Sequence, residues 1–227
     1  MSIACMILGQ SGTGKTASLR DLDPADVLLI QPVKKPLPFR SAGWTHCAKD
    51  NPHGTVFVND NAATICAAMK RTTKPIIVVD DFQYVLANEF MRRSDEKGFD
   101  KFTDIARHAW DILMTAGHLA DHKRVYILAH TQEDDMGNVK AKSIGRLLDE
   151  KITIEGLLTI VMRTKVINGN YLFSTQNNGR DTVKTPMGMF DDEDVPNNLF
   201  EIDRIIQEFY GIDHPVSAHD ATAQATA

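Results

Sequence analysis

The sequence predicts an α/β fold in which a mainly parallel β-sheet is flanked by helices and extended by a C-terminal β-hairpin. Two observations carry this prediction: short apolar runs alternate with segments of helical periodicity, and an Asn-Gly pair joins two apolar runs late in the chain. Short, continuous apolar runs are typical of strands that are buried on both faces of a parallel sheet. The expected parallel strands span residues 3–8, 27–30, 55–58, 76–79 and 125–129.

The segments between these strands predict helices over residues 15–21, 62–71, 84–93 and 101–119. The longest of them has apolar residues at intervals of three and four, which is the spacing of one buried helical face. That face consists of Phe102, Ile105, Ala109, Ile112, Leu113 and Ala116.

The pattern changes after the fifth strand. Residues 132–138 are polar and rich in turn formers, so we expect a long flexible loop there, or a loop with one helical turn. Apolar runs at 157–167 and 171–175 then flank Asn168-Gly169. This pair tolerates the positive φ angles of a type I′ turn, and the segment therefore predicts a β-hairpin.

The chain of 227 residues can form one substantial core, so we expect a single domain over residues 1–212. The domain ends with an amphipathic helix at 199–210, and the tail at 213–227 has too few apolar side chains to be ordered. Hydrophobic residues make up 43% and charged residues 24%, which are ordinary globular values. No apolar stretch approaches the ~20 residues of a membrane span, and we expect a cytoplasmic protein.

The three cysteines, Cys5, Cys47 and Cys66, are an odd number and contain no C-x-x-C pair. This pattern favours reduced thiols over a disulfide framework. His46, Cys47 and His53 are close in sequence, but no fourth ligand follows at the usual spacing, and we expect no zinc site there.

The net charge of -5 argues against a protein that coats nucleic acid without specificity. The charge distribution is uneven, because residues 136–184 contain eight basic and four acidic side chains. A basic segment on an acidic body is typical of a nucleic-acid contact, and it is also typical of a solvated face. Both interpretations remain open at this stage.

The first strand is followed by a complete G-x-x-x-x-G-K-[ST] phosphate-binding loop, Gly9-Gln10-Ser11-Gly12-Thr13-Gly14-Lys15-Thr16. The glycines let backbone amides turn toward phosphate oxygens. We therefore expect a nucleoside triphosphate to bind the eight residues of this loop and the next residue, Ala17. Lys15 is the expected catalytic cation for the β- and γ-phosphates, and the Thr16 hydroxyl is an expected ligand of Mg²⁺.

A pair of carboxylates follows the fourth apolar run, where Ile76-Ile77-Val78-Val79 leads into Asp80 and Asp81. This is the pattern of a Walker B strand, and we expect Asp80 to reach the shell of the magnesium ion. Asp81 has two interpretations. It is either the general base that polarises the attacking water or the N-cap of a helix that begins near Phe82.

The phosphate loop, the Asp80-Asp81 strand and a strand ending in His130-Thr131-Gln132 occur in the order seen in P-loop ATPases, and the chain resembles those of the RecA-like core type. Over residues 1–200 it resembles the small ATP-binding proteins of tailed phages. Those proteins are usually described as AAA-family ATPases, and some are grouped with minimal RecA-like single-strand annealing proteins. The resemblance also rests on residues 80–84, 88–93, 147–153 and 185–190.

This resemblance implies ATP and Mg²⁺ as cofactors, and ATP hydrolysis linked to single-stranded DNA in recombination, annealing or replication within the infected host cell. It further implies a homo-oligomer, with phage replication or recombination proteins as additional partners. A polar group at the end of the sensor strand detects the γ-phosphate in such ATPases, so His130, Thr131 and Gln132 are candidates, and His130 and Gln132 count among the expected catalytic residues. Where these enzymes usually place a catalytic glutamate, this chain has Gln31, so Asp81 takes that role or hydrolysis is slow.

The resemblance also indicates which loops enter the DNA channel, namely residues 92–101 and 132–146. Lys140, Lys142 and Arg146 are candidates for phosphate contacts, which would make binding fall steeply with salt. The second loop contains no aromatic residue, so base stacking is not expected there.

Arg180 and Lys184 resemble the basic residues that RecA-like ATPases direct at the γ-phosphate of a neighbouring subunit. Surface solvation explains these two residues equally well.

Two other functions share the phosphate loop: a nucleotide-gated assembly protein or helicase loader with little turnover, and a small-molecule kinase. The kinase interpretation lacks a convincing Arg-rich lid in this sequence.

Overall fold

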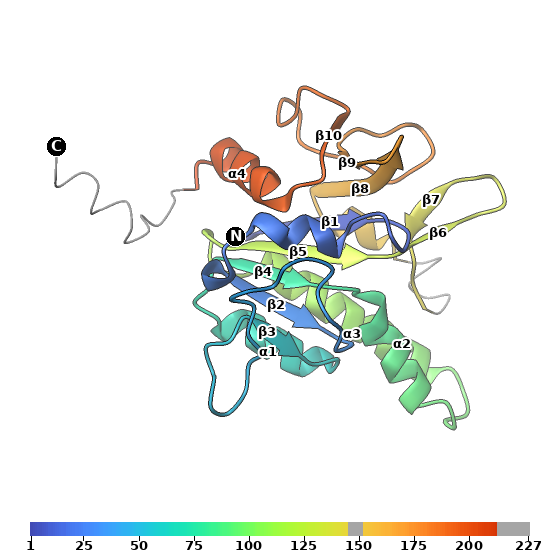
Figure 1. Ribbon diagram of the computed structural model, residues 1–227. Coiled ribbons are helices and arrows are strands. Elements are labelled where there is room, and N and C mark those ends of the chain that lie inside the picture. Colours follow the sequence, from blue (N-terminus) through green and yellow to red (C-terminus); the bar gives the residue numbers. More distant parts are fainter. Residues whose placement is uncertain (145–151, 213–227) are drawn as a thin grey trace.

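The structure is a computed structural model that describes residues 1–144 and 152–212 (Figure 1). The predicted tail at 213–227 and the predicted DNA contact Arg146 lie outside the described residues. One sheet contains β1 (Ile3–Leu8), β2 (Val27–Gln31), β3 (Val56–Val58), β4 (Ile76–Val79), β5 (Arg124–Ala129), β8 (Ile160–Ile167), β9 (Asn170–Ser174) and β10 (Asp194–Pro196).

The order of these strands is β10-β9-β8-β1-β5-β4-β2-β3. From β8 to β3 every neighbouring pair is parallel. The β8–β9 hairpin turns at Asn168 and Gly169, which both have positive φ, and β9 and β10 continue the sheet in antiparallel orientation. The predicted α/β class, the mainly parallel sheet and the C-terminal antiparallel strands are thus confirmed.

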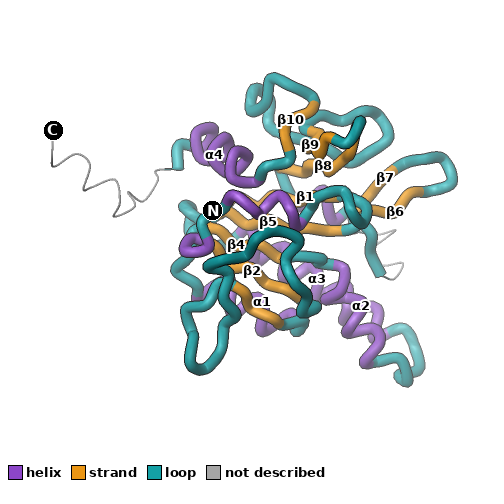
Figure 2. Tube along the Cα trace, viewed as in Figure 1, coloured by secondary structure: helices purple, strands orange, loops and turns teal. Residues whose placement is uncertain are grey.

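Helices cover both faces of the sheet (Figure 2). One hydrophobic core lies between the sheet and α1 (Ala62–Arg71), α2 (Gln83–Arg92) and α3 (Asp100–Gly117). The second lies between the opposite face and two elements, the 3₁₀ helix η1 (Thr16–Asp21) and α4 (Leu199–Tyr210). Two further 3₁₀ turns are η2 (Pro24–Asp26) and η4 (Ile154–Leu157). Among the described residues, no helix combines the length and apolarity needed to cross a membrane.

The alternation of side chains along the central strands assigns each residue to one core. In β1, Met6 and Leu8 belong to the core under α1 and α3, whereas Cys5 and Ile7 belong to the core under α4. Both faces of the strand are buried, which explains why its sequence is continuously apolar.

Asparagine caps account for the accuracy of two predicted helices. The Asn61 side chain accepts a hydrogen bond from the Thr64 amide, and the Asn198 side chain accepts one from the Phe200 amide. Such caps satisfy amides that the first helical turn leaves without partners. Gly211 ends α4 with a left-handed φ of 61°. The bounds predicted for these two helices agree with α1 and α4.

Two predicted segments differ from the structure. The helix expected at 15–21 is the short 3₁₀ helix η1, in which the Ser18 hydroxyl donates to the Lys15 carbonyl at 2.6 Å. A serine that bonds to a nearby carbonyl competes with regular α-helical bonding.

The loop expected at 132–138 is instead a β-hairpin formed by β6 (Thr131–Glu133) and β7 (Val139–Ala141). The Asp134 carboxylate accepts hydrogen bonds from the amides of Met136 and Asn138, at 2.9 and 2.8 Å. These bonds close the turn between β6 and β7, so the polar sequence orders its own backbone.

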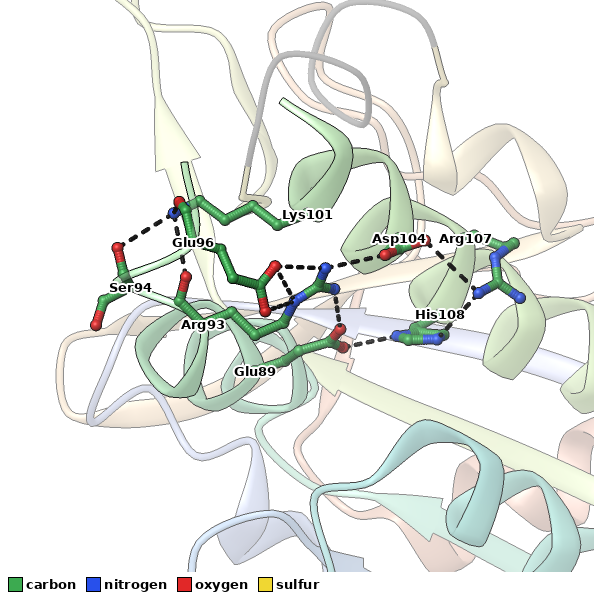
Figure 3. Close-up of polar contacts among 8 residues, drawn as sticks. All are labelled: Glu89, Arg93, Ser94, Glu96, Lys101, Asp104, Arg107 and His108. Carbon is green, nitrogen blue, oxygen red and sulfur yellow. Dashed lines mark hydrogen bonds and ion pairs between the residues drawn. The ribbon is translucent and has the colours of Figure 1, made fainter. Parts of the chain in front are cut away.

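The connection between α2 and α3 is held by a dense polar network (Figure 3). The Arg93 guanidinium pairs with the carboxylates of Glu89, Glu96 and Asp104, at 2.8–3.1 Å. The Lys101 ammonium donates to the carbonyls of residues 93, 94 and 96, which satisfies the backbone after the end of α2. Two cations of the first expected DNA loop, Arg93 and Lys101, are therefore engaged within the protein.

Candidate nucleotide-binding site

The phosphate-loop sequence lies at the carboxyl end of β1, between β5 and β8. Gly12 and Gly14 have φ angles of 80° and 94°, a region that glycine enters without steric cost. Gly9 is required for a different reason, because a Cβ there would lie 1.8 Å from the Thr164 Oγ1 of β8. The loop is thus packed directly against the neighbouring strand.

Lys15 folds back over its own loop. Its ammonium donates to the carbonyls of Gly9 and Gln10 at 2.8 and 2.9 Å, and the residue is 5% exposed. Burial lowers the pKa of Lys15 to about 8, although the charges of Asp80 and Asp81 oppose this shift. The ammonium is held where a phosphate chain could exchange for the two carbonyl oxygens.

Thr16 and Asp80 meet at the end of the site that the sequence assigned to magnesium. The Thr16 hydroxyl donates to the Asp80 carboxylate, at 2.9 Å to Oδ1 and 3.1 Å to Oδ2. Burial and the neighbouring Asp81 carboxylate raise the pKa of Asp80 to about 6. A hydroxyl beside a buried carboxylate is a set of hard oxygen donors, which fits Mg²⁺ bound together with phosphate oxygens.

Asp81 has a left-handed φ of 53° and does not cap α2, whose N-cap is Phe82 without a side-chain bond. Its carboxylate forms an ion pair with Lys35 through Oδ2, and its Oδ1 lies 3.3 Å from the His130 Nε2. The N-cap interpretation of Asp81 is therefore wrong. The strained backbone directs the carboxylate toward two cationic or proton-donating partners.

His130 follows the carboxyl end of β5, the strand between β1 and β4. Its backbone amide donates to the Gln83 side chain at 3.2 Å. Burial and the positive charge of Lys15 lower the pKa of His130, although Asp81 acts in the opposite direction. The strand order therefore brings His130 between the phosphate loop and the Asp80-Asp81 pair.

A pocket of about 540 Å³ opens over these groups. This volume lies within the range of about 300–1,000 Å³ that is usual for small-molecule sites. Its walls come from the loop after β1, the loop after β2, the ends of β4 and β5, and the β8–β9 hairpin. The lining residues are Ser11, Gly12, Gly14, Lys15, Thr16, Ala17, Val33, Lys35, Pro36, Pro38, Asp81, Tyr84, His130 and Tyr171.

Gln31 lies next to Asp80 on the face of the sheet that η1 covers, because β2 and β4 pair Ile30 with Val79. Gln31 is buried, and neither polar atom of its side chain has a hydrogen-bond partner among the described residues. A buried amide without partners costs stability, so its retention is consistent with a ligand or a water at this edge of the site.

Several side chains of the site were not predicted from the sequence. Lys35 and Tyr171 line the pocket, and Asn197 lies beside the phosphate loop, where a Cβ on Gly14 would be 3.2 Å from its Nδ2. The Asn197 Nδ2 is buried and has no partner within the part of the chain that the structure describes. The Lys34-Lys35 pair near the end of β2 was the one available signal, and nothing local distinguished Lys35 from Lys34.

The sensor candidates separate in the structure. His130 lines the pocket, whereas Thr131 and Gln132 belong to β6, where Gln132 pairs with Lys140 of β7. Lys142 follows β7, and its amide donates to the His130 carbonyl at 2.7 Å. The β6–β7 hairpin, with Lys140 and Lys142 on or next to its second strand, is therefore continuous with the strand end that enters the pocket.

Arg180 and Lys184 lie outside the pocket lining. The Arg180 carbonyl accepts a hydrogen bond from the Val139 amide at 2.7 Å, so this segment runs beside the β6–β7 hairpin. Lys184 exchanges two backbone hydrogen bonds with Val161 of β8, at 2.8 and 2.9 Å. Their action on the γ-phosphate of a neighbouring subunit stays a prediction.

Comparison with known proteins assigns no family to this chain. No protein-family model matches the sequence, and no curated protein matches it. The functional interpretation therefore rests on the motif, the strand order and the side-chain geometry described above.

Proposed function

We propose that this protein binds and hydrolyses ATP with Mg²⁺, as a P-loop ATPase of the RecA-like core type. The contact between Thr16 of the phosphate loop and Asp80 after β4 is the observation that carries the proposal. The two residues are 64 positions apart, and each was assigned to magnesium on its own motif. Their meeting under a pocket of nucleotide size supports a single Mg·ATP site.

The residues at the site suggest a division of roles. Lys15 leaves the carbonyls of its loop and binds the β- and γ-phosphates, while Thr16 and Asp80 hold Mg²⁺, which neutralises phosphate charge. Asp81 accepts a proton from the attacking water, whose oxygen forms a bond to the γ-phosphorus as the bond from that phosphorus to the β,γ-bridging oxygen breaks and ADP leaves with this oxygen. His130, hydrogen-bonded to Asp81, orients this carboxylate and the water.

We further propose that the protein acts on single-stranded DNA, as its resemblance to phage recombination ATPases implies. Lys140 and Lys142 lie on or next to β7, and the Lys142 amide bonds to the His130 carbonyl. A nucleotide that moves His130 would therefore also move the strand that carries these two lysines. This connection supports a coupling between the phosphate site and DNA contacts.

A second candidate function is a nucleotide-gated assembly protein with little turnover. Two observations favour it: Gln31 offers a neutral amide where a catalytic glutamate is expected, and Asp81 is already paired with Lys35. In that case ATP binding changes the conformation or the oligomer, and hydrolysis only resets it.

Calorimetry with Mg·ATP and turnover assays with and without single-stranded DNA distinguish these functions. We expect binding in either case, turnover stimulated by DNA for the recombination ATPase, and negligible turnover with ATP-dependent assembly for the switch.

Lys15→Ala should weaken Mg·ATP binding by about thirtyfold, because hydrogen bonds to charged groups contribute about 2 kcal/mol each. Lys49→Ala, at an exposed lysine, is the matched control. Wild-type protein that takes up no Mg·ATP would refute the proposal.

A further inference from the structure

Lys35 belongs to the loop between β2 and β3, which is anchored to the core near the pocket. Phe39 and Trp44 pack against the core under α4 and form an edge-to-face pair with ring centroids 5.6 Å apart. Lys35 lies four residues before Phe39, next to Lys34 and Pro36 in the chain, and its side chain is 40% exposed. The ammonium is therefore presented to the pocket by a partly exposed side chain close to an anchored part of the loop.

The ammonium of Lys35 and the imidazole of His130 occupy both oxygens of the Asp81 carboxylate. Lys35 pairs with Oδ2, and the His130 Nε2 lies 3.3 Å from Oδ1. Both oxygens of the carboxylate therefore have partners among the described residues. A water molecule that approaches Oδ2 has to compete with the Lys35 ammonium for this oxygen.

The second ammonium of the pocket is also directed at the protein itself. Lys15 is bound to the carbonyls of Gly9 and Gln10, and it lines the same pocket as Lys35. Two ammonium groups thus line one pocket. In the absence of a bound anion, Lys15 bonds to backbone carbonyl oxygens and Lys35 pairs with a carboxylate oxygen. A polyphosphate would compete for both ammonium groups, because it brings several anionic oxygens into the same pocket.

We propose that Lys35 exchanges partners when nucleoside triphosphate binds: it leaves the Asp81 carboxylate and pairs with the terminal phosphate. The inference rests on the proposed function and assigns to this site a sensor for the third phosphate. No covalent bond changes in the exchange. The ammonium keeps its protons, and the Asp81 Oδ2 loses its lysine partner and becomes accessible to a water molecule.

This partner exchange links recognition to catalysis. Mg·ADP fills the phosphate loop through Lys15 and leaves Lys35 on Asp81, so the base stays blocked. Mg·ATP supplies the additional phosphate that draws Lys35 away. The protein therefore discriminates triphosphate from diphosphate with a lysine that lies outside the phosphate-loop motif.

The test measures the affinities of Mg·ADP and of the Mg²⁺ complex of a β,γ-imido ATP analogue by calorimetry. Lys35→Gln should weaken binding of the analogue by about tenfold or more, because a charge-assisted hydrogen bond is lost, while affinity for Mg·ADP stays within about twofold. Lys35→Arg should retain most of the preference for the triphosphate. Lys34→Gln, at the adjacent exposed lysine, is the matched control and should behave as wild type.

A second variant tests the resting state of the exchange. Asp81→Asn removes the partner that Lys35 must leave, so it should tighten binding of the ATP analogue, and adding Lys35→Gln should abolish that gain. The inference is overturned if Lys35→Gln affects both nucleotides equally or neither, or if Asp81→Asn acts identically in both backgrounds. Wild-type protein that binds neither nucleotide overturns the proposed function as well, whereas normal binding with an unchanged preference overturns the partner exchange alone.

Discussion

Asp80 combines deep burial with a second carboxylate next to it in the chain, an arrangement that disfavours its charged form. Burial and Asp81 raise its pKa to about 6, against an ordinary value of 3.8. The Thr16 hydroxyl and the charges of Lys15 and Lys35 offset only part of this cost. A residue that destabilises the metal-free protein at neutral pH is thus retained at the position proposed for magnesium, which is the expected conflict between stability and function.

The stability of the metal-free, nucleotide-free protein should depend on pH through Asp80. Because the folded state binds the Asp80 proton more tightly than the unfolded state, this group favours folding below about pH 4, and the contribution is lost as pH rises through about 6. Asp80→Asn should remove this decline and raise the free energy of unfolding at pH 7 by up to about 3 kcal/mol. Denaturant titrations at several pH values measure the effect.

The same variant should lose Mg²⁺-dependent binding of ATP, so that stability and affinity change in opposite directions. Asp121→Asn is the control, because the Asp121 side chain is 90% exposed. A less stable Asp80→Asn protein at pH 7 would contradict the assignment of Asp80 as an electrostatically costly group.

At the scale of elements, the phosphate loop depends on β8 as much as on β1. The Thr164 hydroxyl of β8 lies 2.6 Å from the Thr13 hydroxyl and donates to the Leu8 carbonyl at 3.2 Å. Gly9 is the residue that allows this approach, since a Cβ there would overlap the Thr164 Oγ1. The packing of the loop against β8 therefore requires glycine at position 9. The motif alone explains this glycine only by the backbone freedom that it gives the loop.

Gly9→Ala should displace the loop or β8, which lowers the melting temperature and reduces Mg·ATP affinity. Forced overpacking of this kind costs about 1–3 kcal/mol. Adding Thr164→Ala removes the closest atom and should restore part of the stability, while Thr164→Ala alone should be mild. Thermal unfolding and calorimetry of the three variants measure this cycle.

Gly117→Ala serves as the comparison, because nothing lies within 4 Å of a Cβ built at that helical glycine. Wild-type stability and affinity in Gly9→Ala would show that the loop does not rest against β8.

Local pattern predicted most elements because their determinants are local. The bounds of α1 and α4 follow from Asn61, Asn198 and the apolar periodicity between the caps, and the Asn168-Gly169 turn predicted the β8–β9 hairpin. The β6–β7 hairpin was missed because it lacks an apolar alternation, and its turn is closed by the Asp134 carboxylate instead. Side-chain bonds of this kind leave little trace in hydropathy.

At the scale of the whole molecule, α4 is fastened to the sheet by one buried carboxylate. Asp203 accepts two hydrogen bonds from the Arg124 guanidinium, at 3.0 and 2.8 Å, and one from the Tyr126 hydroxyl at 2.6 Å. The Gln207 amide adds a fourth bond at 2.7 Å. Arg124 begins β5 and His130 follows its end, so the network and the candidate site lie at opposite ends of one strand.

Asp203→Ala should lower the free energy of unfolding by about 3–5 kcal/mol, because it leaves the buried Arg124 guanidinium without its partner. Well below the lowered melting temperature, Mg·ATP affinity should stay close to that of the wild type. Arg204→Ala is the control, since its ion pair with Glu201 is exposed and worth at most about 1 kcal/mol. Equal stability of the two variants would show that the network does not fasten α4.

The sequence by itself determined the α/β class, most strands and helices, and the two motifs that place Lys15, Thr16 and Asp80 in one site. These features depend on neighbours in the chain, since periodicity, caps and loop spacing act over a few residues. Only the tertiary structure decided that Lys35 reaches Asp81 across 46 positions and that Thr164 reaches the Leu8 carbonyl across 156. Such contacts follow from strand order and register, which bring distant segments together at the carboxyl edge of the sheet, and no local pattern encodes them.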